Sequence, residues 1–221
     1  MTTPDPPRAA VGRFRLTLGR GSLLAAVLLA IAIATTTTYR SDSEAKAGAK
    51  PAFDPAKYAA KTYGPKVVPA IKKDAVDLAT LHKALTDDPN AAGKRYGHRA
   101  GAGAYSYAVT LTGTAGTARG GLLPVTVAGL GKDTRVSVQI GPAVSGTALR
   151  DAAGFIKFSQ FVNQVDYADA ATALNARVKS QVLKGFDAAA AKGDKLTVTG
   201  AMTPLTPDVL TITPIAIEEA S

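Results

Sequence analysis

Residues 105–112 read YSYAVTLT, and this stretch decides the fold that the sequence predicts. Every second residue is aromatic or aliphatic, beginning at Tyr105, and the residues between them are small or polar. Because successive side chains of a strand point to opposite faces, this period of two predicts a half-buried β-strand. The pattern returns over residues 123–127 and 136–140, with glycine-rich stretches between the runs. The three runs together predict an antiparallel meander.

Two further strands are predicted near the end of the chain, over residues 195–202 and 209–217. Both runs alternate apolar and polar residues, but the apolar phase of the second run slips at Thr213-Pro214. Proline cannot donate to the ladder of hydrogen bonds between strands. The slip therefore predicts a β-bulge at the edge of a sheet.

A helical insert is predicted between the third and fourth strands. Residues 147–153 are one short candidate, and a longer helix begins at Asp166, which is placed to cap its free amide groups. Gly185 is a natural stop for this longer helix. Its expected buried stripe consists of Tyr167, Ala171, Leu174, Val178 and Val182.

Three strands, a helix and two strands follow one another in the order of an oligonucleotide/oligosaccharide-binding (OB) barrel. The predicted fold class is therefore α+β. It comprises an N-terminal transmembrane helix, a short helical segment, and a five-stranded OB-like β-barrel with a helical insert between strands 3 and 4.

The helical segment is predicted over residues 53–100. Asp54-Pro55 opens a first helix well, because aspartate caps free amides and proline suits the first turn. A second helix begins near Asp74 or Asp77. Asp88-Pro89 should end this helix and start a short turn that runs to Gly97.

An apolar run at residues 21–34 follows four arginines near the start of the chain. The run has 14 residues, which fits the core of an export signal cleaved after Ala34. Residues 22–39 taken as one helix approach the length of a membrane span, and an uncleaved anchor is the form we expect. The arginine excess keeps the leading side in the cytoplasm, so the rest of the chain should lie outside the inner membrane.

The predicted organisation has four parts. Residues 1–40 are the basic segment and membrane anchor, or signal peptide, with contact to the inner membrane through residues 21–39. Residues 41–52 are small, charged and aperiodic, as in a tether. Residues 53–100 are the helical segment, and residues 101–221 are the barrel domain.

Composition excludes several classes of protein. The sequence contains no cysteine, so a disulfide, a thiol nucleophile, a thiolate metal site and a lipid linked to cysteine are all excluded. It contains no tryptophan, the commonest platform for stacking a sugar. The first 40 residues hold five arginines and one aspartate, so much of the net charge of +9 belongs to the targeting segment. The rest is only mildly basic, which makes a nucleic-acid partner an unfavoured prediction.

A ligand-binding loop is predicted where the third strand turns into the insert. Two glycines and a proline can hold exposed backbone near a partner, and Arg150 could reach an anion. The alternative is a tight structural turn in which Arg150 pairs with a neighbour such as Asp151. The candidate residues are Gly141, Pro142, Gly146, Thr147, Arg150 and Asp151.

A second group of candidates is Asn163, Gln164 and Asn175, whose amides could hydrogen-bond a sugar. Alternatively, these amides satisfy buried backbone where the chain turns. Three phenylalanines precede them at three-residue spacing, and we expect these rings to belong to the core or an interface. They are Phe155, Phe158 and Phe161.

No metal, cofactor or catalytic residue is predicted. His82 and His98 are the only histidines, and neither has an evident carboxylate partner. Residues 94–99 are locally basic and could touch lipid phosphates, but a solvated loop is the simpler interpretation. The sequence lacks a glycine-flanked serine elbow, a phosphate-binding glycine loop and a paired-histidine zinc motif.

Several blocks of the sequence resemble one bacterial family, known as domain of unknown function 2291. The most specific blocks are residues 138–142 (VQIGP) and 146–151 (GTALRD). Residues 163–168 (NQVDYA) resemble the next block, and residues 74–79 (DAVDLA) and 94–97 (KRYG) resemble blocks near the N-terminus of the family.

The resemblance implies a predicted periplasmic lipoprotein. Genes of this family are often found near sugar ABC-transporter genes, which implies an accessory role in uptake, and no activity is established for its members. This sequence departs from many members because it lacks the lipid-bearing cysteine.

The predicted function is that of a membrane-anchored extracytoplasmic binding or scaffold protein. Its expected role is accessory to a sugar or other solute ABC importer, with importer components or the solute as partners. The alternative is an enzyme that acts on the envelope or on a sugar.

Overall fold

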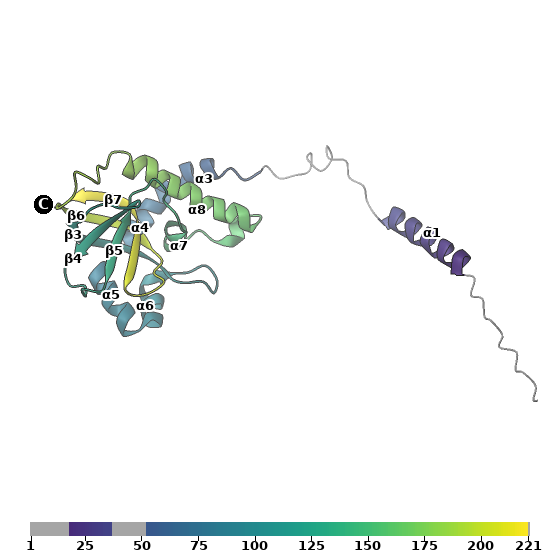
Figure 1. The fold of residues 1–221 in the computed structure, drawn as a ribbon, viewed down its shortest axis with the longest axis horizontal. Helices are drawn as coiled ribbons and strands as arrows, with labels where there is room; N and C mark the ends of the chain where they lie inside the picture. Colours follow the sequence, from purple (N-terminus) through teal and green to yellow (C-terminus); the bar gives the residue numbers. More distant parts are fainter. Residues whose placement is uncertain (1–17, 37–51, 221) are drawn as a thin grey trace, which may run out of the picture. The chain divides into compact units, whose positions relative to one another are not determined.

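The computed structural model describes residues 18–36 and 52–220, and the chain divides into two compact units at Ala52 and Phe53 (Figure 1). Residues 1–17 lie outside the described residues. The same is true of the predicted tether at residues 41–52, apart from its last residue.

The first unit contributes one helix, α1 (Leu18–Thr36). Among the described residues, no helix combines the length and the apolar character that crossing a membrane requires. The transmembrane helix predicted over residues 21–39 is therefore not supported. Its uninterrupted apolar run covers only residues 21–34, which is about 21 Å of helix against about 30 Å of hydrocarbon.

The second unit contains a closed barrel of five strands. They are β3 (Ser106–Ala115), β4 (Leu122–Val127), β5 (Arg135–Gln139), β6 (Lys195–Met202) and β7 (Val209–Glu219). Their order around the barrel is β3-β4-β5-β7-β6, and β6 pairs with β3 to close it. The antiparallel meander of β3, β4 and β5 is confirmed. The parallel pairing of β5 with β7 was not visible in the residue pattern.

The irregularity predicted in the last strand is present, but its setting differs. The register between β6 and β7 shifts at Thr199/Gly200, where Gly200 faces Pro214 and Thr199 faces Ala216. This leaves one extra residue, Ile215, on β7. The strand is not an edge, because β5 pairs with its first half and β6 with its second. Pro214 is accommodated because the pairing with β5 ends at Ile212.

The predicted insert lies between β5 and β6. It contains α7 (Ala148–Ala152), a short 3-10 turn at Phe158–Gln160, and α8 (Gln164–Val178), which continues into a π-helical turn at Lys179–Leu183. The predicted stripe of α8 is confirmed by burial of Leu174 and Val178, with Tyr167 and Ala171 on the same face.

The start of α8 differs from the prediction. Asn163 is the capping residue, because its side chain accepts a hydrogen bond from the Asp166 amide at 2.8 Å. Asp166 itself lies in the first turn, where its negative charge interacts favourably with the positive end of the helix dipole.

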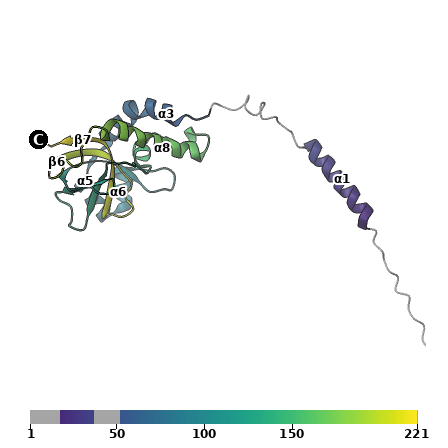
Figure 2. The same cartoon turned by 45° about the horizontal axis from the view of Figure 1, so that its top comes forward.

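Two stretches of helix precede the barrel. The first comprises α3 (Pro55–Thr62), a π-helical segment at Tyr63–Val67 and α4 (Val68–Asp74). Asp54 caps it as predicted, by accepting a hydrogen bond from the Lys57 amide at 2.9 Å. In both views α3 lies along α8 (Figures 1 and 2).

The second stretch comprises α5 (Leu78–Asp87) and α6 (Pro89–Tyr96). The helix α6 replaces the turn predicted after Asp88-Pro89. Asp88 ends α5 and its side chain also accepts from the amides of Asn90 and Ala91, so one residue closes one helix and caps the next. Two-residue strands, β1 (Val76–Asp77) and β2 (Gly97–His98), flank this stretch and pair with β3.

The core has two parts. The inside of the barrel holds one cluster, which includes Leu111, Val138 and Ile212, and α5 covers it with Leu78 and Leu81. The outer face of β3 and β6 holds the other cluster, in which Leu149, Leu174 and Ile71 come from α7, α8 and α4. The insert is thus fixed to the barrel through apolar burial, which positions the polar residues at its start.

Candidate functional site

Arg150 and Asp151 of α7 form a closed polar network with Tyr167 of α8. Arg150 donates from Nε to Asp151 Oδ1 at 2.8 Å and from Nη2 to Oδ2 at 3.1 Å. Its Nη1 donates to the carbonyl oxygen of Tyr167 at 3.0 Å. Arg150 is only 6% exposed, and each of its three guanidinium nitrogens donates a hydrogen bond within the protein. The geometry is that of the structural alternative, in which Arg150 pairs with Asp151.

Tyr167 contributes its ring and its hydroxyl to the same network. The Arg150 guanidinium carbon lies 3.5 Å from the centroid of the ring, which is a cation–π contact. The hydroxyl donates to Asp151 Oδ1 at 3.3 Å. Burial raises the pKa of Tyr167; the positive charge of Arg150 opposes this rise and the negative charge of Asp151 adds to it.

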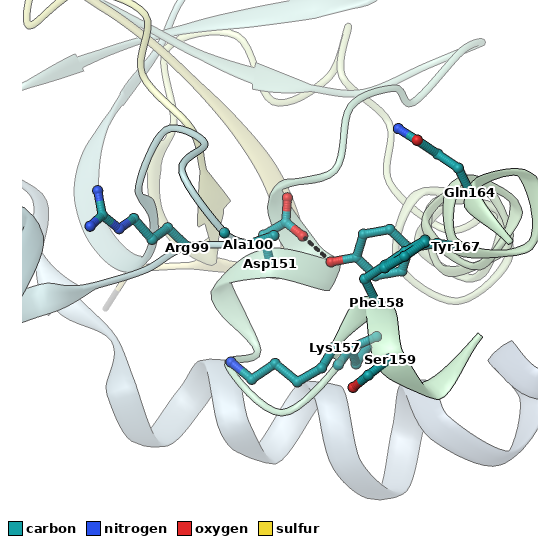
Figure 3. A pocket seen from close by; sticks show the side chains of 10 residues that line it. Arg99, Ala100, Asp151, Lys157, Phe158, Ser159, Gln164 and Tyr167 are labelled. Atoms are coloured by element: carbon teal, nitrogen blue, oxygen red, sulfur yellow. Dashed lines mark hydrogen bonds between the residues drawn. The ribbon is translucent and has the colours of Figure 1, made fainter. Parts of the chain in front are cut away.

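A cavity of about 610 Å³ opens beside this network, and Figure 3 shows the residues that line it. Asp151 and Tyr167 form part of its wall, joined by the hydrogen bond between them. Two other segments complete the lining, namely the loop at residues 99–101 and the stretch at residues 156–159, together with Gln164 at the start of α8. The volume falls within the range of about 300–1,000 Å³ that is typical of sites for small molecules.

The cavity lining combines one exposed ring with charged and polar side chains. Phe158 is 51% exposed and meets the Tyr167 ring edge to face, with centroids 5.6 Å apart. In the view of Figure 3, Arg99 and Lys157 lie on one side of the Asp151–Tyr167 pair and Gln164 on the other. Such a lining can hold a small molecule that has both an apolar face and polar groups.

Two side-chain amides hold the loop at residues 141–147 near its end. Gln139 of β5 accepts a hydrogen bond from the Ser145 amide at 2.9 Å and donates to the Ser145 carbonyl at 3.1 Å. Asn175, buried on α8, donates to the carbonyl of Gly146 at 2.8 Å. Gly141 and Gly146 have φ values of 90° and 93°, which glycine adopts without strain.

This loop borders a different cavity, of about 500 Å³. Gly141 and Pro142 line one side of it, and Lys179, Leu183 and Lys184 line the other. The predicted site residues are therefore divided. Asp151 and Gln164 line the first cavity, whereas Gly141 and Pro142 line the second.

The remaining candidates have structural contacts. Asn163 is exposed and caps α8, and Asn175 holds the loop at Gly146. Thr147 occupies the capping position of α7, but its side chain makes no capping hydrogen bond. The side chains of Asn163 and Thr147 are exposed to solvent, whereas that of Asn175 is buried.

Both histidines have polar partners that the sequence did not reveal. His98 Nε2 lies 3.4 Å from Asp74 Oδ2, and the His98 ring packs on Gly154, where an added Cβ would lie 2.8 Å from the ring. His82 Nε2 lies 3.2 Å from the Thr134 hydroxyl. Within residues 18–36 and 52–220, no group of three or more potential metal-ligating side chains comes together.

Sequence reasoning missed most of the residues that line the first cavity, among them Arg99, Lys157, Phe158 and Ser159. Arg99 was noted only as part of a basic loop, and Phe158 only as a member of the phenylalanine series, whereas Lys157 was not singled out. No pattern in the sequence pointed to them, because the loop at residues 99–101 and the stretch at residues 156–159 come together only in the fold.

The chain belongs to the family described as predicted periplasmic lipoprotein (DUF2291), whose model matches residues 24–218. The resemblance of the sequence blocks to this family is thereby confirmed. No protein with a curated description matches the chain.

The fold is similar to that of a solved structure, an OB-fold protein from Thermotoga maritima. The two chains are 20% identical and align with a TM-score of 0.58, over 76% of this chain and 99% of the other. At this identity the similarity concerns the fold alone, and it supports the OB-like assignment of the barrel.

Proposed function

We propose that residues 53–221 form an extracytoplasmic binding module for a sugar or a related small polar solute, and that the module is accessory to a solute importer. One observation carries the proposal, namely the cavity of about 610 Å³ beside Asp151 and Tyr167. The family assignment supports the address. The association with sugar transporter genes, which the resemblance of the sequence blocks implies, favours an importer as partner.

The chemistry of the cavity lining supports a sugar as ligand. The exposed Phe158 ring can pack against the C–H face of a sugar ring, which is apolar. Gln164 and Ser159 are exposed, and within the described residues their side chains make no hydrogen bond across this cavity. A bound solute can therefore use their donors and acceptors without breaking contacts inside the protein.

The Asp151 carboxylate supports binding rather than catalysis. It accepts three hydrogen bonds, two from Arg150 and one from Tyr167. A general acid or base needs a carboxylate oxygen that can exchange a proton with the substrate. A carboxylate held in this way is better suited to fixing the wall of a site, and we propose no reaction for it.

The N-terminal segment supports an extracytoplasmic address. Residues 21–34 are apolar and follow four arginines, and the described side chains of α1 are exposed, with Leu29 63% exposed. An arginine-led apolar segment directs export, so we propose that it carries the module across the inner membrane.

The test is titration calorimetry of the full-length protein with monosaccharides, beginning with D-glucose and D-glucuronate. We expect saturable binding that Phe158→Ala and Gln164→Ala each weaken about tenfold, through lost stacking and a lost hydrogen bond. Both side chains are exposed, so both variants should remain folded, with a small drop in melting temperature for Phe158→Ala because its contact with the Tyr167 ring is lost. Val165→Ala is the matched control, because this residue is 66% exposed on α8 and does not line the cavity.

Two outcomes would contradict the proposal. Absence of binding to the whole set of monosaccharides would remove the cavity as a sugar site. Turnover of a sugar by the wild type, detected as a new product after incubation, would instead favour an enzyme that acts on sugars.

A further inference from the structure

We propose that the cavity beside Asp151 and Tyr167 is selective for an acidic sugar, that is, a sugar ring that carries a carboxylate or a phosphate. This inference rests on the proposed function, because it names the ligand class of the same site. It follows from the charges that remain free in the cavity once the contacts within the protein have been assigned.

The first step concerns the charged pair in the wall. Asp151 is the only acidic residue among those that line the cavity, and its charge is matched by Arg150, with Nε to Oδ1 at 2.8 Å. Arg150 uses each of its guanidinium nitrogens within the protein. The charges of Arg150 and Asp151 therefore neutralise each other, and neither side chain offers an unpaired charge to a ligand in the cavity.

The second step concerns the two cations at the rim. Lys157 and Arg99 line the cavity and are exposed. Within the described part of the chain, neither forms an ion pair with a carboxylate. The Arg99 guanidinium lies 4.7 Å from the centroid of the Tyr105 ring, a contact that holds it at the rim and leaves its charge uncompensated. The cavity thus has an excess of positive charge.

The third step is the arrangement of these groups around the ring of Phe158. Lys157 directly precedes Phe158 in the sequence, and Ser159 directly follows it, and all three line the cavity. A sugar ring stacked on the phenyl face, with its acidic group on the side of the cavity where Lys157 and Arg99 extend in Figure 3, would bring that group towards the Lys157 ammonium. A charge-assisted hydrogen bond from the ammonium group is about twice as strong as a neutral one, so this contact selects the acidic sugar over the neutral one.

The experiment compares D-glucuronate with D-glucose on the full-length protein at low ionic strength. The two sugars differ only at carbon 6, which is a carboxylate in D-glucuronate and a hydroxymethyl group in D-glucose, so the ratio of their dissociation constants reports the effect of exchanging that neutral group for a charged one. We expect D-glucuronate to bind about tenfold or more tightly than D-glucose. Added salt should reduce this ratio, because the rim cations are exposed to solvent and are screened.

Two lysine variants locate the effect. Lys157→Gln should weaken D-glucuronate binding more than D-glucose binding, and should therefore lower the ratio of their affinities, with Arg99 supplying the preference that remains. Lys192→Gln removes the same charge from an exposed lysine that does not line the cavity, and should preserve the ratio. A melting curve for each variant verifies that both remain folded.

The outcomes separate this inference from the proposed function. Equal binding of the two sugars by the wild type would overturn the acidic-sugar inference and leave the sugar-binding function standing. Binding of neither, and of no D-glucose 6-phosphate, would overturn both. Binding of D-glucose 6-phosphate without D-glucuronate would identify the anionic group as a phosphate, and inorganic phosphate that binds as tightly as the sugar phosphate would overturn the inference in favour of a simple anion site.

Discussion

The burial of an arginine decides whether its guanidinium can contact a ligand or only other groups of the protein. An arginine in a glycine-rich turn carries the same chemistry in both cases. The structure buries the Arg150 guanidinium between Asp151 and the Tyr167 ring, and that burial depends on α7 packing against α8, which the local sequence does not encode.

We predict that Arg150→Ala destabilises the protein. The substitution leaves the partly buried Asp151 carboxylate without its ion-pair partner, which costs about 3–5 kcal/mol. The free energy of unfolding from urea titration measures the effect. Arg177→Ala is the control, because Arg177 is partly exposed on α8 and forms no ion pair within the described residues. An Arg150→Ala protein of normal stability that has lost sugar binding would restore Arg150 to the ligand site.

A second prediction concerns Tyr63, whose hydroxyl is buried without a hydrogen-bond partner among the described residues. At neutral pH, Tyr63→Phe should leave the free energy of unfolding unchanged or raise it by about 1 kcal/mol, because the substitution removes an unpaired polar group. A loss of 2 kcal/mol or more, roughly what a buried hydrogen bond to a charged group contributes, would show that this hydroxyl has a partner.

The same residue predicts a pH dependence. Burial raises the pKa of Tyr63 to about 12, above the value of about 10 for an unfolded tyrosine. The unfolded chain thus loses this proton at lower pH than the folded chain does. The contribution of Tyr63 to the free energy of unfolding is therefore fully present below about pH 10. As the pH rises towards 12, the free energy of unfolding falls by roughly 2 kcal/mol. Tyr63→Phe should therefore lose less stability than the wild type between neutral pH and about pH 11.

At the scale of an element, the starts of α3, α5, α7 and α8 were predicted to within a few residues, whereas α6 was predicted as a turn and the capping residue of α8 was missed. Asp166 fits the pattern of a cap as well as Asn163 does, since both carry a side-chain acceptor. The choice depends on where the chain leaves the extended conformation, and Asn163 holds it with φ −151° and ψ 175°. That geometry follows from the turn at residues 158–161, which no local pattern indicates.

We predict that Asn163→Ala lowers the free energy of unfolding by about 1 kcal/mol through loss of the cap. Asp166→Ala should have a smaller effect, which arises from the helix dipole and is screened by salt. Chemical denaturation of both variants at low and high salt separates the two mechanisms. A salt-dependent loss for Asn163→Ala would mean that its side chain does not act as the cap.

Periodicity predicted the buried stripe of α8 from Tyr167 to Val178, whereas Val182 lies beyond the helix and is only partly buried. Leu174 is fully buried between α8 and the barrel. Leu174→Asp places an unpaired charge there and should unfold the domain, since the penalty of several kcal/mol approaches the stability of an ordinary domain. Thr172→Asp, at an exposed position on the same helix, should leave circular dichroism and melting temperature near the wild-type values. A folded Leu174→Asp protein would show that this face is not core.

For the whole molecule, the five strands were predictable because a half-buried strand shows its period of two in the residues themselves. Closure of the barrel was inferred from the order of elements alone. The cavity was not predictable, because it brings the loop at residues 99–101 together with lining residues between Asp151 and Tyr167, which lie far from that loop in the sequence. Its partners meet only after α7 and α8 pack on the outer face of β3 and β6.

The N-terminal segment sets the last prediction, which concerns the address of the domain. Four arginines before the apolar run at residues 21–34 should hold the leading side in the cytoplasm, so the second unit, from Phe53 onward, should lie outside the inner membrane. Protease added to intact spheroplasts should then degrade the protein, while a cytoplasmic enzyme in the same cells survives. A domain that resists protease until the cells are lysed would place it inside and would contradict the export of this chain.

The same cells can be used to determine whether the apolar segment at residues 21–34 is cleaved or retained. The sequence contains no cysteine that could carry a lipid, so the segment itself is the part of the sequence to test for a lasting attachment. N-terminal sequencing of the protein recovered from the membrane and soluble fractions decides the question. A product that begins near Thr35 identifies residues 21–34 as the core of a cleaved signal. An intact N-terminus in the membrane fraction identifies them as the attachment, and then an alkaline carbonate wash should leave the protein with the membranes.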